Sequence, residues 1–287
     1  MKLMSKMQDE AQKKSTVRLD TGEVIRQRLP RYSRYIPRFL VRALAKLICE
    51  DQLNEVARLH GHKTGVDFAN GVIDYLQAGI KVVGEENLPH PGDGRYIFVS
   101  NHPMGGLDGL AIISLIGSRF GGDVKFLVND LLMAVTPLKD VFLPINKFGK
   151  QSRGAAEQIE AAYSGNGQML TFPAGLCSRL HDDGTVSDLM WQKSFVTKAV
   201  EYGRDIVPMY FEGENSKMFY RVARLRKRLK LKFNIEMMLL PREMVKCRGR
   251  QFTLRVGKPI ASSSLDASAP LSEAERIRKI CYGLAGR

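Results

Sequence analysis

Several features that would assign a chain to a common class are missing from this one. Its four cysteines include no Cys-x-x-Cys pair, which excludes a disulfide framework and a cysteine-based zinc site. No apolar run approaches the roughly 20 residues that cross a bilayer, and the first residues lack the apolar core of a signal peptide. The Gly-x-Ser-x-Gly elbow of serine hydrolases does not occur. We therefore expect a cytosolic protein with reduced thiols, whose contact with any membrane is peripheral.

Acidic residues are scarce relative to basic ones. The 287 residues include 30 aspartates and glutamates against 44 lysines and arginines, a formal net charge of +14. Such an excess favours acidic partners, among them nucleic acids, anionic lipid head groups and acidic carrier proteins. The charge alone does not choose among them. The apolar fraction of 44 % is ordinary for a globular protein, so the chain can bury a core.

Short apolar runs alternate with helical stretches over most of the chain. Helical patterns cover residues 154–164 and 192–202, for example. Alternation of this kind is typical of an α/β fold, so we predict a mostly parallel seven-stranded sheet flanked by helices. The expected strands are 81–83, 96–100, 124–128, 141–145, 168–172, 205–210 and 252–256.

The same patterns divide the chain into four segments. A polar tail is predicted at 1–22, an N-terminal helical, membrane-facing segment at 23–80, an α/β domain at 81–260 and a C-terminal helix at 261–287. Within the second segment, residues 32–60 indicate one amphipathic helix with a basic stripe. That helix would either lie in a membrane interface or pack on the domain with its stripe in water. The stripe consists of Arg34, Arg38, Arg42 and Lys46.

One glycine-rich turn carries both a histidine and an aspartate. Asn101 and His102 follow an apolar strand, and Asp108 lies six positions after the histidine. Gly105 and Gly106 between them allow the backbone to bring both side chains to one spot. Open α/β sheets place active sites at the carboxyl ends of strands, and a carboxylate can orient an imidazole that exchanges protons. The turn is either such a site or a surface loop in which the aspartate caps the next helix.

Other strand ends also carry polar or proline turns. An amide and a cation follow the fourth strand at Asn146-Lys147, and Pro208 interrupts the sixth. The turn after the fifth strand contains a glycine, which allows the backbone to approach a ligand closely, and polar side chains that are available to bind an anion. Its candidate residues are Phe172, Pro173, Gly175, Ser178 and Arg179.

These blocks, in this order, resemble the glycerolipid (lysophospholipid) acyltransferases. Asn101, His102 and Asp108 match the family's Asn-His and nearby Asp. Residues 172–178 are similar to its Phe-Pro-Glu-Gly-Thr-Arg-Ser block, and residues 206–208 to its apolar strand with a central proline. With a continuation at 257–260, the resemblance covers over half of the chain and implies an α/β acyltransferase that associates with membranes.

The chain departs from the family pattern in three places. Five residues instead of four separate His102 and Asp108, and Asn146-Lys147 stands in place of an Asp-Arg pair. In the third block, Ala174 and Cys177 replace a glutamate and an arginine. Because that block grips glycerol phosphate in the family, the change implies another acceptor. The variant of the first block resembles a hemolysin-like bacterial branch that includes acyltransferases of amino-acid lipids, such as ornithine or glycine lipids.

The resemblance implies transfer of a fatty acyl group from a thioester to the hydroxyl of a lysolipid in membrane lipid biosynthesis. His102 would be the general base and Asp108 would orient its ring. Backbone amides of the glycine-rich turn would be candidate oxyanion donors. The donor would be acyl carrier protein or coenzyme A, with no cofactor or metal, at the cytoplasmic face of the inner membrane. Candidate substrate contacts are Asn101, Gly105, Gly106, Asn146, Lys147, Phe172, Pro173, Gly175, Ser178 and Arg179.

Other interpretations of these residues stay open. The main alternative is an inactive relative with the same fold that binds nucleic acid or membranes through its basic surface. The basic run at 221–232 contains no aromatic residue to stack on bases, so nucleic acid is not the expected partner. A metal hydrolase would need to combine His60 and His62 with the glycine-rich turn, although no carboxylate accompanies that pair at ligand spacing.

Overall fold

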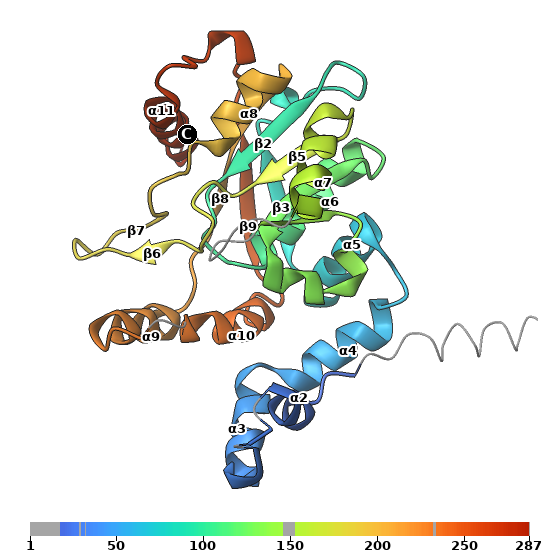
Figure 1. Cartoon of the computed structure of the whole chain (residues 1–287), viewed down its shortest axis with the longest axis vertical. Coiled ribbons are helices and arrows are strands. Elements are labelled where there is room, and N and C mark those ends of the chain that lie inside the picture. Colours follow the sequence, from blue (N-terminus) through green and yellow to red (C-terminus); the bar gives the residue numbers. More distant parts are fainter. Residues whose placement is uncertain (1–17, 29, 32, 146–152, 232–233, 287) are drawn as a thin grey trace, which may run out of the picture.

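A single seven-stranded sheet organises the protein (Figure 1). The structure is a computed structural model that describes residues 18–28, 30–31, 33–145, 153–231 and 234–286. The strand order is β1-β9-β8-β2-β5-β3-β4, so the predicted seven-stranded α/β fold is confirmed. Its strands are β1 (Gly79–Val83), β2 (Tyr96–Ser100), β3 (Val124–Asn129), β4 (Phe142–Ile145), β5 (Gln168–Thr171), β8 (Asp205–Glu212) and β9 (Gln251–Val256).

The central strand β2 sets the position of the candidate site. It pairs in parallel with β5 on one side and β8 on the other, and all five of its residues are buried. β8 and β9 are antiparallel, whereas β9 and β1 are parallel, so β1 and β9 run opposite to the other five strands. Because β2 ends between two parallel neighbours, its carboxyl end lies where such sheets form a crevice.

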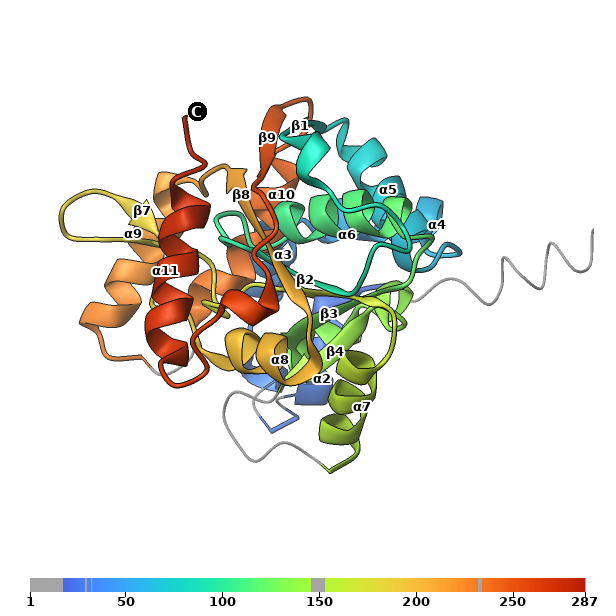
Figure 2. The ribbon, with the colours of Figure 1, turned by 90° about the horizontal axis from the view of Figure 1, so that it is seen from above.

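Helices cover both faces of the sheet, as Figure 2 shows. In β2, Phe98 points into one core, together with α5 (Gly65–Leu76) and α6 (Leu107–Arg119). Ile97 and Val99 point into the other core, as the period-2 alternation of a strand requires. The second core is closed by α7 (Arg153–Ser164), α8 (Ser194–Tyr202) and α11 (Pro270–Tyr282).

The N-terminal helices correct one prediction. Residues 32–60 do not form one helix: α3 (Arg38–Leu47) and α4 (Glu50–His60) are separate, because Cys49 between them adopts a left-handed backbone with φ 55°. α2 (Thr21–Arg28) packs against α3. The predicted 23–80 segment is also not uniform: α5 is buried in the sheet's core and α4 adds Val56 to that core, while α2 and α3 lie farther from the sheet (Figure 1).

Two further helices and a small hairpin lie near the carboxyl ends of the central strands. The basic run predicted at 221–232 is helical over α9 (Lys217–Arg228), and Lys230 beyond it adopts φ 52°. α9 is followed by α10 (Leu240–Val245), and a small hairpin joins β6 (Arg179–Leu180) to β7 (Val186–Ser187). Within the described ranges, every helix is too short or too polar to cross a bilayer. The 3-10 helices are η1 (Ser33–Tyr35), η2 (Glu85–Asn87), η3 (Asp130–Ala134), η4 (Thr136–Leu138), η5 (Ile235–Leu239) and η6 (Ser262–Ser264).

One buried cation joins α7 to β8. Arg204, which is fully buried, donates from Nε to the carbonyl of Tyr163 at 2.7 Å and from Nη1 to that of Gly167 at 2.8 Å. Its Nη2 donates to the carbonyls of Ala162 and Gly165. The guanidinium thus satisfies carbonyls at the C-terminal end of α7, where a positive charge is also favoured by the helix dipole. Burial lowers the pKa of Arg204 to about 10, which leaves it charged at neutral pH.

We expect Arg204→Lys to lower the free energy of unfolding by about 3 kcal/mol, because an ammonium cannot reach four carbonyls in a fork and leaves some unsatisfied. Urea unfolding measures the change as a lower midpoint at constant slope. Arg153→Lys is the control, since Arg153 is exposed and pairs with Glu157 one turn along its own helix; its effect should stay within about 0.5 kcal/mol. Equal midpoints for the two variants would contradict this role.

Candidate active site

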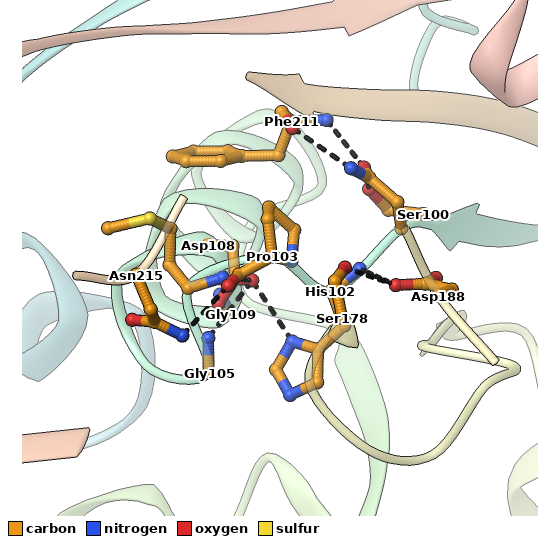
Figure 3. A network of polar contacts seen from close by, with 12 residues as sticks. Ser100, His102, Pro103, Gly105, Asp108, Gly109, Ser178, Asp188, Phe211 and Asn215 are labelled. Atoms are coloured by element: carbon orange, nitrogen blue, oxygen red, sulfur yellow. Dashed lines mark hydrogen bonds and ion pairs between the residues drawn. The ribbon is translucent and has the colours of Figure 1, made fainter. Parts of the chain in front are cut away.

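The histidine and aspartate of the glycine-rich turn converge. His102 follows the carboxyl end of β2, and Asp108 lies in the first turn of α6. The distance from His102 Nδ1 to Asp108 Oδ2 is 3.0 Å (Figure 3). The carboxylate is fully buried, whereas the imidazole keeps 15 % of its surface exposed. The five residues between them therefore do not prevent the contact.

Gly105 makes this loop compact. Its backbone has φ 76°, a conformation that favours glycine. A Cβ at this position would lie 2.6 Å from Cys177 Sγ and 2.7 Å from Leu240 Cδ2, closer than atoms can approach. Gly106 has more room, because its nearest neighbour would be Met244 Sδ at 3.5 Å. Only glycine therefore fits position 105, for steric as well as backbone reasons.

The Asp108 carboxylate is held by the turn's own backbone. Oδ2 accepts hydrogen bonds from the amides of Met104 at 2.9 Å and Gly105 at 3.3 Å, and Oδ1 accepts one from Gly109. Burial alone would raise the pKa of Asp108, but His102 and these amides outweigh it and lower the pKa. The residue does not cap α6, whose N-cap Gly106 has no side-chain partner. The amides of Met104 and Gly105 are engaged by Asp108, which removes them as candidate oxyanion donors.

The imidazole of His102 lies against an aromatic ring. Phe172, in the turn after β5, stacks on it with a centroid distance of 3.9 Å and an interplanar angle of 19°. Burial alone would lower the pKa of His102, but Asp108 and the nearby Cys177 raise it well above its usual value. Of the residues predicted in the Phe-Pro turn, Phe172 is thus the one that meets the histidine ring directly.

The main chain of His102 is bonded to the rest of the Phe-Pro turn. Its carbonyl accepts the amide of Ser178 at 2.8 Å, and its own amide donates to Asp188 Oδ1 at 3.2 Å. Ser178 Oγ donates to the same carboxylate oxygen at 2.6 Å. Ser178 is therefore a buried link between the two turns. Gly175, at φ 64°, donates its amide to the carbonyl of Phe172 and so closes the turn, while the carbonyl of buried Pro173 accepts the amide of Gln192.

Asn101 links the glycine-rich turn to β8. Its Nδ2 donates to the carbonyl of Phe211 at 3.0 Å, and its Oδ1 accepts the Phe211 amide at 2.7 Å (Figure 3). The side chain is buried, so both ends of its amide serve the protein's own backbone. Nearby, Asn215 Nδ2 donates to the carbonyl of Pro103. The predicted residue Asn101 therefore fixes the end of β2 in this structure.

Arg179 lies in a buried ion-pair network. Its Nη2 is 3.0 Å from Glu236 Oε1, and Arg226 Nε is 3.0 Å from Glu236 Oε2. Glu236 is fully buried, so this triad joins β6, α9 and η5 through one carboxylate. Arg179 was predicted to meet an anion of the substrate, but its charge is already paired within the protein. The other predicted cation, Lys147, lies outside the described residues, as does Asn146.

Sequence reasoning missed several residues of this region. Asp188, Trp191 and Tyr282 form a network behind His102, and no motif or spacing singles them out. Cys177 was noted only as a replacement, although its position inside a recognised block could have placed it near the histidine. In the described part of the chain, no three potential metal ligands converge. His60 ends α4, with its ring against Gly71 of α5.

Comparison with known proteins connects this geometry to a family. Residues 23–286 match the family model described as Acyltransferase. The lyso-glycine lipid O-acyltransferase of Bacteroides thetaiotaomicron is 42 % identical over 267 residues, covering 93 % of this chain and 97 % of that protein. The enzyme of the same name from Phocaeicola vulgatus is 41 % identical over 267 residues, covering 93 % and 95 %.

Among solved structures, the crystal structure of the 1-acyl-sn-glycerophosphate acyltransferase PlsC from Thermotoga maritima is similar with a TM-score of 0.47 at 17 % identity. The match covers 88 % of this chain and 86 % of that chain. The family model spans nearly the whole chain, and both relatives exceed 40 % identity over most of their length. This chain therefore belongs to the acyltransferase family and is an O-acyltransferase.

Proposed function

We propose that this protein transfers a fatty acyl group from a thioester to the hydroxyl of a lysolipid, with a lyso-glycine lipid as its acceptor. The observation that supports this most strongly is the His102–Asp108 pair at the end of β2, in a chain over 40 % identical to two lyso-glycine lipid O-acyltransferases. An inactive relative would not need an imidazole that a buried carboxylate orients and that keeps 15 % of its surface exposed at this edge of the sheet.

His102 acts as the general base in this proposal. Its Nδ1 faces the Asp108 carboxylate, so the ring proton resides on Nδ1 and the lone pair on Nε2. Nε2 takes the proton of the acceptor hydroxyl as that oxygen attacks the thioester carbonyl. The tetrahedral intermediate then collapses, the carbon–sulfur bond breaks, and the imidazolium returns the proton to the leaving thiolate. Asp108 stabilises the imidazolium between these two steps.

The acyl donor is acyl carrier protein or coenzyme A. Both present the acyl chain as a thioester, which is reactive enough to need no covalent enzyme intermediate. Both are also acidic, and a chain with a formal charge of +14 attracts them through long-range electrostatics. The exposed basic residues of α9, including Arg221, Arg224 and Lys227, offer such a surface next to the site.

The acceptor is one with little negative charge. In this site Arg179 is paired with Glu236, and neither Ala174 nor Cys177 offers a cationic side chain that would hold a phosphate. Because Arg179 and Arg226 share Glu236, their charges are committed within the protein, and an acceptor with a single glycine carboxylate requires less positive charge than a phosphate dianion. Lys147 and Asn146 remain candidate contacts for that carboxylate.

The protein binds peripherally to an anionic membrane at the cytoplasmic face of the inner membrane. No residue of α3 is buried. Leu47 at its C-terminal end packs against the buried cluster that includes Phe219, so the domain holds that end of the helix, whereas Leu40 in its first half stays exposed. Phe39 within α3 and Tyr35 just before it are 67 % and 68 % exposed, and the guanidinium of Arg34 lies over the Tyr35 ring. Exposed aromatic side chains next to arginines are the composition of a helix that lies in a membrane interface.

We expect His102→Ala to lower acyl transfer by about 10²–10⁴-fold, because the hydroxyl then loses its base. The assay follows a labelled acyl group from acyl carrier protein or coenzyme A onto lyso-glycine lipid. His62→Ala is the matched control, since His62 is exposed at the end of α4, and it should retain full activity. Undiminished transfer by a folded His102→Ala variant would rule out this role, and loss of transfer in the His62 variant would favour the metal interpretation.

The rate should depend on pH through His102. Only the neutral imidazole can accept a proton, so kcat/KM falls as the pH drops through the raised pKa of His102. In Asp108→Asn this pKa is lower, which moves the acid limb of the profile to lower pH while the maximal rate also falls. A profile of kcat/KM against pH measures both changes. Asp51 is exposed on α4, so Asp51→Asn should leave the pH profile unchanged. An acid limb that stays at the wild-type pH in Asp108→Asn would contradict the effect of Asp108 on the pKa of His102.

The ion pair also gives a pH dependence of stability. Because the folded-state pKa of His102 is raised, its stabilising effect is fully present below the usual histidine pKa of about 6.5 and is lost as the pH rises through the raised value.

We expect the protein to sediment with vesicles that contain anionic phospholipid and to be released from them at high salt. Phe39→Ser should weaken this binding by roughly tenfold, because an exposed aromatic ring no longer enters the interface. Met190→Ser, which changes another exposed apolar side chain away from α3, should leave binding unchanged. Binding that is indifferent to lipid charge, or equal in the two variants, would argue against α3 as the contact.

A further inference from the structure

A second buried carboxylate lies behind the histidine. Asp188 is in the loop between β7 and α8 and is 1 % exposed. Its Oδ1 accepts hydrogen bonds from the His102 amide and from Ser178 Oγ, and its Oδ2 accepts one from Trp191 Nε1 at 2.9 Å. All three partners are neutral donors, and within the described residues no cationic side chain pairs with this carboxylate. Figure 3 shows it on the opposite side of His102 from Asp108.

The main chain of Asp188 is fixed from another direction. Its amide donates to the Tyr282 hydroxyl oxygen at 2.7 Å, and its carbonyl accepts Arg278 Nη2 at 3.1 Å. Both residues belong to α11, near the end of the chain. One aspartate therefore joins the glycine-rich turn, the Phe-Pro turn and the C-terminal helix at a single point.

We propose that Asp188 is a positioning residue, whose ionised carboxylate sets the place of His102 by holding its backbone amide to the Phe-Pro turn. The inference rests on the proposed general-base role of His102. An acceptor-only group fits this cradle, because each neighbour of the carboxylate oxygens points a hydrogen at them. Burial raises the pKa of Asp188, and the hydrogen bonds from Ser178, Trp191 and the His102 amide oppose that rise by stabilising the anion.

The charge of Asp188 also acts on the imidazole. The groups that face it or lie close enough to interact with it are His102 on the glycine-rich turn, Tyr210 on β8, and Arg278, Cys281 and Tyr282 on α11. A negative charge near His102 favours the imidazolium. Removing that charge should therefore lower the pKa of His102, an effect that a purely structural link would not have.

Asp188→Asn tests this role because it keeps the shape of the side chain. The amide oxygen can still accept from His102 and Ser178, but its NH₂ group then faces the Trp191 N–H, so two donors oppose each other. We expect kcat to fall by about 10²-fold through the displaced base, with KM for the thioester unchanged. Trp191→Phe alone removes one donor but keeps the carboxylate and its bonds to His102 and Ser178, so its loss of kcat should be much smaller than that of Asp188→Asn. In the double variant the opposing donor is gone, so we expect kcat to recover by roughly tenfold over Asp188→Asn.

Circular dichroism and thermal melting establish that each variant is folded, and NMR titration of the His102 ring gives a readout that does not need turnover. The expected result is a lower pKa of His102 in Asp188→Asn and in the double variant, but not in Trp191→Phe. Wild-type kcat and an unshifted His102 titration in folded Asp188→Asn would overturn the proposal, and so would strictly additive effects in the double variant. If the wild type transfers no acyl group to lyso-glycine lipid while the His102 titration still shifts, the proposed function fails and the positioning role stands.

Discussion

The buried carboxylate of Asp108 is the feature on which the site's geometry depends. An ionised group without solvent must find hydrogen-bond donors, and this one takes two amides from the glycine-rich turn, one from α6 and the imidazole of His102. The hydrogen bonds to this carboxylate therefore hold the turn in its folded-back conformation, and they also orient the imidazole of His102. The steric demand at Gly105 follows from that compactness, since Cys177 and Leu240 close over the turn from the other side.

The sheet explains why this turn lies where it does. β2 is the central strand between β5 and β8, and the side chains of residues 96–99 alternate between two cores. The strand cannot slip in register by one residue without exchanging those cores. Asn101 extends this constraint past the end of β2 by bonding both backbone groups of Phe211. His102, the next residue, thus starts from a point that the fold holds rigidly.

Much of this could be predicted from local sequence, and the rest depends on contacts between distant residues. The seven strands follow from short apolar runs, and the His102–Asp108 pair from two residues in one turn, because both signals are local. The break at Cys49 was not predictable from helical periodicity, since the apolar pattern continues through it. The partner of Arg179 was missed because Glu236 is 57 positions away. Asp188, 86 positions from His102, carries no motif at all.

The pairing of Arg179 bears on how the site selects its acceptor. Separating a buried carboxylate from either of the two arginines that share it costs free energy. Arg179 could therefore bind a substrate only if Glu236 lost one of its two cationic partners. The positive charge that would hold a phosphate is therefore internal, and it fixes α9 against η5 at the edge of the site. In this chain the Phe-Pro turn thus supports His102 through the ring of Phe172 and the amide of Ser178, while the arginine that follows it is committed to Glu236.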